Sequence, residues 1–489
     1  MPIQNFKLRI SIALGIGTCL IYLAFLAPAI WSIDGNAMLE VAISLVKKQN
    51  FRVSEATGAL GVDGYYYSKF YPLLSIIAVP LVAFGLFLSQ RLNLPEVYVS
   101  GACALVLPPL FTALTTALLV LLAFRLGSDR QGACLAALSF AFGTIAIAYA
   151  REFYVEPLLA LLITLSVCLA FGRSNTSIFG ASLSSGLAIL AKPSAIILGP
   201  LLSIYLFLKK RHWSIAITPL IGSIIFALIY AFYNYIRFGN PLSFGQSWMS
   251  NVSSELLAAP VSSKEGTLLI GGLLGLLISP GRGVIWYSPC VVLGLIGFYY
   301  TYKSRSKFLE ALLIIVFSLL FLIVNSGGWW MGGWAWGPRY LLPIFPILLS
   351  LAALLTKRWR LVLITLTTVG FLINAPNLVS FYKRYYVNAM EQQIKVYSPQ
   401  IIWSFENAPF RQSWSLANEQ INDAMQNDVK AVFKTVGTQQ LRGALTHIVP
   451  LWWWFLPIAG IPQWIGALLS VLITGSGLWM IGIAIFEPQ

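Results

Sequence analysis

The chain has 489 residues, of which 58% are hydrophobic and only 10% are charged, and its formal net charge is +15. Soluble proteins carry about 25% charged residues, so this composition excludes an ordinary soluble domain and indicates a polytopic membrane protein. The positive charge does not indicate nucleic-acid binding, because the basic residues form small clusters between apolar runs, as in cytoplasmic loops.

Long apolar runs predict an all-α protein with about twelve membrane-spanning helices, since a helix needs about 20 apolar residues to cross the bilayer. The expected spans are 10–32, 97–124, 131–150, 155–172, 176–191, 194–208, 214–236, 285–302, 309–326, 340–356, 361–378 and 464–485. The first run follows Lys7 and Arg9 and exceeds the usual length of a signal-peptide core, so we expect an uncleaved first helix.

Six basic clusters set the predicted orientation. They are Lys7/Arg9, Arg125/Arg130, Arg173, Lys209/Lys210/Arg211, Lys303/Arg305/Lys307 and Lys357/Arg358/Arg360. With the expected helices all six lie on one side, which the excess of lysine and arginine identifies as the cytoplasm. We therefore expect a multi-pass protein of a bacterial inner membrane, with both termini in the cytoplasm.

The apolar run 71–90 is expected to lie along, or to dip into, the outer membrane interface. It is long enough to span, but a span here would move every later basic cluster to the outside. Pro72, Pro80 and Gly85 also predict a poor straight helix. Interfacial helices are accordingly expected within the first outer loop, 33–96.

The predicted organisation has three parts. Residues 1–380 form a transmembrane catalytic module, residues 381–450 a small extracytoplasmic domain of mixed charge, and residues 451–489 an interfacial segment with the last spanning helix. No internal repeat is found, which argues against a transporter built from inverted halves.

Candidate site residues gather in the expected outer segments, beginning after the first helix. Asp34 follows that helix and could reach a polar cavity, although a role as the cap of the next helix is an open alternative. Asp63 and Lys69 stand around three consecutive tyrosines, in a place where lysine can also extend toward lipid phosphates.

Two further candidates stand at the outer ends of later helices. Glu156 begins a helix, with Pro157 at its first position. A local Arg151–Glu152 pair is the plain interpretation of the preceding residues. Lys192 is a lone cation where two short apolar runs meet, and ionisable groups in such places are functional candidates.

The last candidates lie in two glycine-rich loops. Arg282 in Gly281-Arg282-Gly283 and Arg339 in the loop 327–340 each offer a forked donor to a phosphate. Trp334 and Trp336 could stack on a sugar or a prenyl chain, and Tyr340 follows Arg339. For Trp329 and Trp330 the simpler interpretation is an interfacial aromatic belt.

Taken together, these residues suit a lipid-phosphate substrate at the outer membrane face. Cations bind phosphate, and carboxylates can take the proton from a hydroxyl. Since only two histidines occur, acid–base chemistry falls to the 17 carboxylates.

Short motifs across residues 5–380 resemble the GT-C superfamily of integral membrane glycosyltransferases, in the branch of protein O-mannosyltransferases and lipid A aminoarabinose transferases. The matching segments are 32–35 (SIDG), 67–72 (YSKFYP), 153–157 (FYVEP), 186–193 (GLAILAKP), 237–241 (RFGNP), 279–283 (SPGRG) and 336–340 (WGPRY).

The resemblance implies a sugar transfer from a polyprenyl-phosphate donor to a hydroxyl of a glycan, lipid or protein at the extracytoplasmic face. It makes Asp34 the general base of an inverting reaction. Lys69, Arg282, Arg339 and Lys192 would stabilise the charge that develops on the leaving phosphate. No cofactor is implied with certainty, since some members use a divalent metal and others none; Asp34, Asp63 and Glu156 are the candidate ligands.

Asp34-Gly35 replaces the adjacent acidic pair of the protein O-mannosyltransferases, which puts a protein-serine acceptor in doubt. Two other functions stay open: a flippase or transporter of a lipid-linked or polar substrate, and a ligase that moves a glycan from a lipid pyrophosphate. A flippase needs polar groups at mid-membrane depth, whereas this chain places them at one face.

Overall fold

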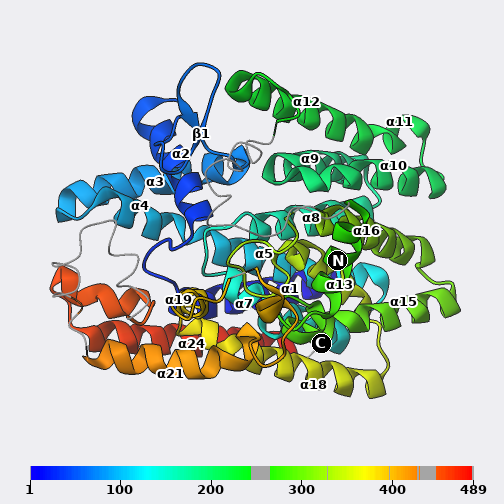
Figure 1. Ribbon diagram of the computed structural model, residues 1–489. Coiled ribbons are helices and arrows are strands. Elements are labelled where there is room, and N and C mark those ends of the chain that lie inside the picture. The colour runs from blue at the N-terminus through cyan, green and yellow to red at the C-terminus, as the bar shows by residue number, and fades with distance from the viewer. Residues whose placement is uncertain are drawn as a thin grey trace.

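The computed structural model describes residues 2–243, 265–327, 329–395, 397–426, 429 and 448–486 (Figure 1). The structure is 75% helical, and its described strands form one two-stranded sheet. Gly328 of the tryptophan-rich loop, and residues 427, 428 and 430–447 of the expected extracytoplasmic domain, lie outside the described residues.

The N-terminal part carries the first outer loop. Its elements are α1 (Pro2–Ala24), α2 (Ile33–Lys48), β1 (Ala59–Leu60), β2 (Tyr66–Tyr67), α3 (Pro72–Leu92) and α4 (Glu96–Ala104). The strands pair antiparallel, with Ala59 opposite Tyr67 and Leu60 opposite Tyr66.

Most of the bundle follows in α5 (Leu107–Leu126), α6 (Arg130–Gly143), α7 (Ala146–Tyr149), α8 (Glu156–Ala170), α9 (Asn175–Ala191), η1 (Pro193–Ile197), α10 (Leu198–Leu208), α11 (Trp213–Ala216) and α12 (Thr218–Phe238). The next elements are α13 (Glu265–Ile278), α14 (Val284–Tyr287), η3 (Pro289–Val292), α15 (Leu293–Ser304), α16 (Phe308–Ser326), η4 (Arg339–Ile344), α17 (Phe345–Ala352), α18 (Lys357–Asn374) and η5 (Ala375–Leu378). The last described elements are α19 (Lys383–Glu391), α20 (Pro399–Ile402), α21 (Pro409–Gln426), η7 (Trp452–Ala459) and α24 (Gln463–Phe486).

Within the described residues, seven helices are long and apolar enough to cross a membrane, so the polytopic all-α architecture is confirmed but the count of twelve is not. The seven are Asn5–Ala24, Pro72–Leu92, Glu96–Leu126, Trp213–Phe238, Phe308–Ser326, Lys357–Leu378 and Gln463–Phe486. Other expected spans are shorter or interrupted, because 3-10 turns form at Pro193, Pro289 and Pro343.

Helix α3 forms over the segment whose prolines and glycine predict a poor straight helix. It is one continuous helix of 21 residues with Pro72 in its first turn and Pro80 inside it. Gly85 lets α4 approach closely, since a Cβ there would lie 2.5 Å from the Cα of Ser100. By length and composition α3 qualifies as a span, and its interfacial placement stays a prediction.

The six basic clusters meet at one end of the bundle, as the predicted orientation requires. Neighbouring clusters are joined by Arg130 over the Phe6 ring, Arg360 with Asp129, Arg125 with the carbonyl of Cys168, Arg211 with the carbonyl of Gly172, and Lys209 and Lys307 with Glu310. Helix α8 runs toward this end from Glu156, and α9 runs back from it to Lys192. The candidate site therefore lies at the opposite end.

The described part of segment 381–450 packs directly on that opposite end. Tyr386 donates to the carbonyl of Ala335 at 2.5 Å, and Trp414 Nε1 donates to the carbonyl of Leu372 at 2.9 Å. Lys383 forms an ion pair with Glu152 at 3.1 Å. This segment thus supports the loops that carry the site.

Candidate functional site

Arg339 is the centre of a buried cluster of charges. Its Nη1 and Nη2 each donate to Asp34 Oδ2 at 3.2 Å, and its Nε lies 3.2 Å from Glu156 Oε1. The side chains of Arg339 and Glu156 are 8% and 2% exposed, whereas that of Asp34 is 27% exposed. One guanidinium therefore joins two carboxylates from distant parts of the chain, and one of these carboxylates stays accessible.

Asp34 is held in the first turn of α2 without serving as its cap. Ser32 is the N-cap, and its Oγ accepts from Gly35 N at 3.0 Å, so the capping alternative for Asp34 is wrong. A Cβ on Gly35 would lie 2.5 Å from Ser32 Oγ and 2.9 Å from the carbonyl oxygen of Phe153. The start of α2 thus approaches the segment before α8 closely.

Glu156 and Lys192 meet because α8 begins where α9 ends. Glu156 is the first residue of α8, with proline next to it as predicted, and Lys192 is the C-cap residue of α9 with an extended backbone. Lys192 Nζ lies 3.9 Å from Glu156 Oε1 and 3.6 Å from the centre of the Tyr340 ring. Neither Lys192 Nζ nor Glu156 Oε2 has a hydrogen-bond partner among the described residues.

Lys69 faces the same cluster from the loop between β2 and α3. Burial lowers the pKa of Lys69, the negative charge of Asp34 raises it, and the positive charge of Arg339 lowers it further. Both groups are therefore within electrostatic reach of Lys69. The structure thus brings together six of the candidate residues, Asp34, Lys69, Glu156, Lys192, Arg339 and Tyr340, and their roles stay predictions.

Arg282 has a different place from the one expected. It is completely buried, and it donates to the carbonyls of Met331 at 3.0 Å and Gly333 at 3.1 Å, and to the hydroxyl of Tyr386 at 2.6 Å. The donors of its guanidinium are bonded to the loop 327–340, to the carbonyl of Gly281 and to Tyr386. Arg282 thereby shapes the loop that carries Arg339.

The tryptophans of this loop also differ from expectation. Trp336 is 1% exposed and donates through Nε1 to Asn374 Oδ1 at 2.7 Å, so it is a core residue and cannot stack on a sugar or prenyl chain in this conformation. Trp334 is half-buried and stacks on Tyr386. Trp330 is buried against Gly275 rather than placed in a belt, whereas Trp329 remains 37% exposed.

Asp63 stands apart on the exposed hairpin. It accepts from Tyr67 Oη at 2.7 Å and from Tyr65 N at 3.2 Å, and it forms an exposed ion pair with Arg52. This hydrogen bond from Tyr67 lowers the pKa of Asp63. Among the described residues no three histidine, cysteine or acidic side chains form a group that could hold a metal ion. Asp34, Asp63 and Glu156 therefore do not form the common ligand set that the sequence left open.

The structure adds a second buried ion pair that sequence interpretation missed. Glu152 and Lys383 are 4% and 5% exposed, and Lys383 Nζ donates to both carboxylate oxygens at 3.1 Å. The guanidinium carbon of Arg339 lies 4.4 Å from the centre of the Tyr154 ring, and Lys383 Nζ lies 5.5 Å from the same centre. Tyr154 thus links this pair to the central cluster.

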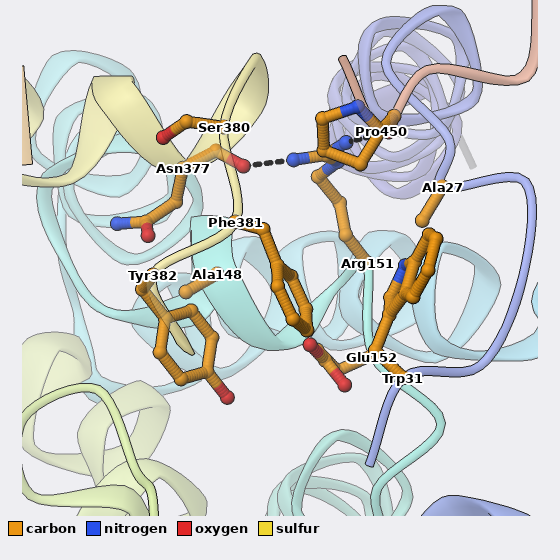
Figure 2. Close-up of a pocket in the computed structure, with 10 residues that line it drawn as sticks. All are labelled: Ala27, Trp31, Ala148, Arg151, Glu152, Asn377, Ser380, Phe381, Tyr382 and Pro450. Carbon is orange, nitrogen blue, oxygen red and sulfur yellow. Dashed lines mark hydrogen bonds between the residues drawn. The ribbon is translucent and has the colours of Figure 1, made fainter. Parts of the chain in front are cut away.

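The expected Arg151–Glu152 pair does not form. Arg151 instead donates to the carbonyls of Asn377 and Pro450 (Figure 2) and to that of Phe25. A small cavity lies beside it, lined by Ala27, Trp31, Ala148, Arg151, Glu152, Asn377, Ser380, Phe381, Tyr382 and Pro450. The segment 151–157 (REFYVEP) holds two carboxylates with the aromatic pair Phe153-Tyr154 between them, and this pattern could have marked Glu152 as a site residue. The sequence around Lys383 gives no indication that Glu152 is its partner.

Fold and site together define a polytopic membrane protein with a buried cluster of cations and carboxylates at the end opposite to its basic loops. No protein-family model matches the chain, and no curated protein sequence is significantly similar to it.

Several solved structures are similar in arrangement. One is ArnT from Cupriavidus metallidurans bound to undecaprenyl phosphate, at 13% identity and a TM-score of 0.46, covering 96% of this chain and 77% of that one. Another is the oligosaccharyltransferase AglB from Archaeoglobus fulgidus, in complex with an inhibitory peptide and a dolichol-phosphate, at 12% identity and a TM-score of 0.48. That match covers 90% of this chain and 56% of AglB, so this chain spans just over half of AglB's length.

Both are GT-C membrane glycosyltransferases, the superfamily that the sequence motifs resemble. With TM-scores below 0.5 and identities near one residue in eight, these likenesses supply no residue roles, substrates or mechanism. The function is therefore argued from the residues of this chain.

Proposed function

We propose that the chain is an inverting glycosyltransferase that moves a hexosyl or pentosyl group from a polyprenyl-phosphate donor to a hydroxyl acceptor at the extracytoplasmic face of a bacterial inner membrane. The observation that carries the proposal is the Asp34–Arg339–Glu156 cluster, with Lys192 and Lys69 beside it. It combines an accessible carboxylate with three cations at the end of the bundle opposite to the basic loops.

Asp34 is the proposed general base. Arg339 holds Asp34 Oδ2, so the carboxylate is fixed in orientation while part of it stays exposed. It takes the proton of the acceptor hydroxyl as that oxygen bonds to the anomeric carbon. The bond from the anomeric carbon to the phosphate oxygen breaks on the opposite side, and the polyprenyl phosphate leaves as an anion.

The cations stabilise that leaving phosphate. Glu156 holds Arg339 through Nε, and the two terminal nitrogens donate to Asp34 Oδ2, so the positive charge of the guanidinium is fixed beside the accessible carboxylate. Lys192 Nζ has no hydrogen-bond partner among the described residues, and ammonium groups of this kind suit phosphate oxygens. A buried, water-poor setting strengthens each of these interactions.

The proposed organisation assigns catalysis to residues 1–380. Residues 381–450 support the site through Lys383 and Tyr386, and 451–489 supply an interfacial segment and the last spanning helix. The donor is a polyprenyl-phosphate sugar. No metal is assigned, because the three candidate carboxylates do not form one group.

A reconstitution experiment tests this function. The purified full chain in nanodiscs is incubated with hydroxyl acceptors and, in parallel, with polyprenyl-phosphate sugars or lipid-pyrophosphate-linked glycans, and products and co-purified lipids are identified by mass spectrometry. We expect sugar transfer with release of polyprenyl phosphate. Movement of the intact lipid-linked sugar across the bilayer with no bond broken would support a flippase instead, and consumption of lipid pyrophosphate alone would support a glycan ligase.

A further inference from the structure

The sequence motif Arg237-Phe238-Gly239-Asn240-Pro241 ends α12 and has no role in the chemistry proposed above. Arg237 is nevertheless 2% exposed. A buried guanidinium is costly unless its donors find partners, so the partners of Arg237 indicate what it is there to hold.

Those partners lie in α12 and in the first outer loop. Nη1 donates to the carbonyl of Ser68 at 2.5 Å, Nη2 to Asn234 Oδ1 at 2.7 Å and Nε to the carbonyl of Tyr233 at 3.1 Å. The centre of the Tyr233 ring lies 3.6 Å from the guanidinium carbon. Two of these bonds stay within α12, and the third crosses to the residue before Lys69.

The main chain of Arg237 fixes the same loop a second time. Its carbonyl accepts from Val62 N at 3.0 Å, and a Cβ on Gly61 would lie 2.7 Å from that carbonyl oxygen. The next residue, Phe238, is 5% exposed and packs edge-on against Tyr67 of β2. The end of α12 therefore holds the hairpin at both its turn and its second strand.

Lys69 follows immediately. Ser68 and Lys69 are consecutive, so their Cα atoms are about 3.8 Å apart, and α3 begins only three residues after Lys69. Helix α12 also packs along α9: a Cβ on Gly222 of α12 would lie 2.3 Å from Ser182 Oγ of α9, and α9 ends at Lys192. Two cations of the site are thus set by the same pair of helices.

We propose that Arg237 is a positioning residue that holds Lys69 in register with Arg339 and Lys192, so that the affinity for the donor phosphate depends on the bond from Arg237 to the Ser68 carbonyl. This inference rests on the proposed function, because it takes the phosphate of a polyprenyl-phosphate sugar as the ligand. Arg237 itself touches no substrate.

Binding of polyprenyl phosphate to the full chain in nanodiscs tests the inference, with Kd and Tm measured for each variant. We expect R237A and K69A each to weaken binding about tenfold, the loss of one charge-assisted contact. The double variant R237A/K69A should bind no more weakly than K69A, because both changes remove the same contact. A further tenfold loss in the double variant, or unchanged binding by R237A, would overturn the proposal.

Two other variants separate positioning from general stability. R237K keeps one donor for the Ser68 carbonyl and loses the bonds within α12, so its Tm should fall while its Kd stays within about twofold of the unmodified chain. A tenfold loss of affinity in R237K refutes the proposal even where R237A fails to fold.

Arg130 is the control, since its guanidinium also binds main-chain carbonyls, those of Ile483 and Ala484, at the far end of the bundle. R130A should lower Tm and leave Kd unchanged, and a loss of affinity equal to that of R237A would assign both effects to stability. If the unmodified chain binds no polyprenyl phosphate, the proposed function fails, whereas normal binding with an unaffected R237A removes only the role of Arg237.

Discussion

The two ends of the helical bundle use their charged side chains in different ways. At the basic end, Arg130 binds carbonyls at the end of α24, and Arg360 pairs with Asp129, whose side chain is 57% exposed. At the other end, Arg339, Glu156 and Lys192 are all at least 90% buried, and three of their polar atoms lack hydrogen-bond partners among the described residues.

This difference in burial separates charges that can set the orientation of the protein in the membrane from charges that can serve a functional site. Exposed ion pairs such as Arg360–Asp129 contribute about 0–1 kcal/mol each, although the basic end also holds one buried carboxylate, Glu310, which pairs with Lys209 and Lys307. Buried charges cost several kcal/mol unless well paired, and they persist chiefly where a site needs them. Substitutions at the two ends should therefore have effects of very different size.

The largest effect is expected for D34N. The asparagine keeps the shape of Asp34 and loses the base, so the transfer rate should fall by about 10³-fold while the purified variant still binds polyprenyl phosphate. The matched control is E310Q, which changes a buried carboxylate at the basic end that pairs with Lys209. Transfer by D34N at the unmodified rate would remove Asp34 as the base.

R339A should have the next largest effect. It removes the cation shared by Asp34 and Glu156, so binding of polyprenyl phosphate should weaken by about 10- to 100-fold. R339K should recover part of that loss, because lysine keeps the charge but not the two-pronged geometry. Equal affinities of R339A and the unmodified chain, measured in nanodiscs, would contradict the phosphate-binding role.

K383M should act mainly on stability. It leaves Glu152 buried without its partner, and breaking a buried pair in this way costs about 3–5 kcal/mol. The double variant E152Q/K383M should be more stable than K383M, since no unpaired charge remains. Thermal unfolding of the two variants and the unmodified chain measures this, and a double variant less stable than K383M would show that the pair is not the source of the loss.

The smallest effect is expected for R360A at the basic end. Its partner Asp129 is largely exposed, so the change in unfolding free energy should stay within about 1 kcal/mol and the transfer rate should not change. A loss of activity comparable to that of R339A would break the distinction between the two ends.

The sequence identified those candidate residues whose position at the end of a helix is sufficient to locate them. Asp34, Glu156 and Lys192 stand at helix ends next to apolar runs, and the order of the runs places those ends together. Lys383 and Glu152 could not be paired in this way, because 231 residues separate them. Their contact exists only through tertiary packing.

Tertiary packing also explains why the structure differs from the expectations for Arg282 and Trp336. Here the sequence suggested ligand contacts, whereas the structure shows contacts within the protein. A glycine-flanked arginine and a loop tryptophan are typical of ligand contacts, yet main-chain carbonyls and Asn374 are their partners here. The path of the loop 327–340 decides this, and no local pattern encodes it. For α3, the apolar residues form one continuous helix with Pro80 inside it, and its interfacial placement stays a prediction.

The close approach at Gly35 bears on how this chain differs from the protein O-mannosyltransferases that its motifs resemble. There, two acidic residues are adjacent on one backbone, and the peptide unit fixes their separation. Here no side chain fits at position 35 unless Ser32 or the main chain at Phe153 shifts, so a second acidic residue cannot occupy it. Glu156 places a second carboxylate on Arg339 from α8, so the spacing of Asp34 and Glu156 is a property of helix packing rather than of covalent geometry.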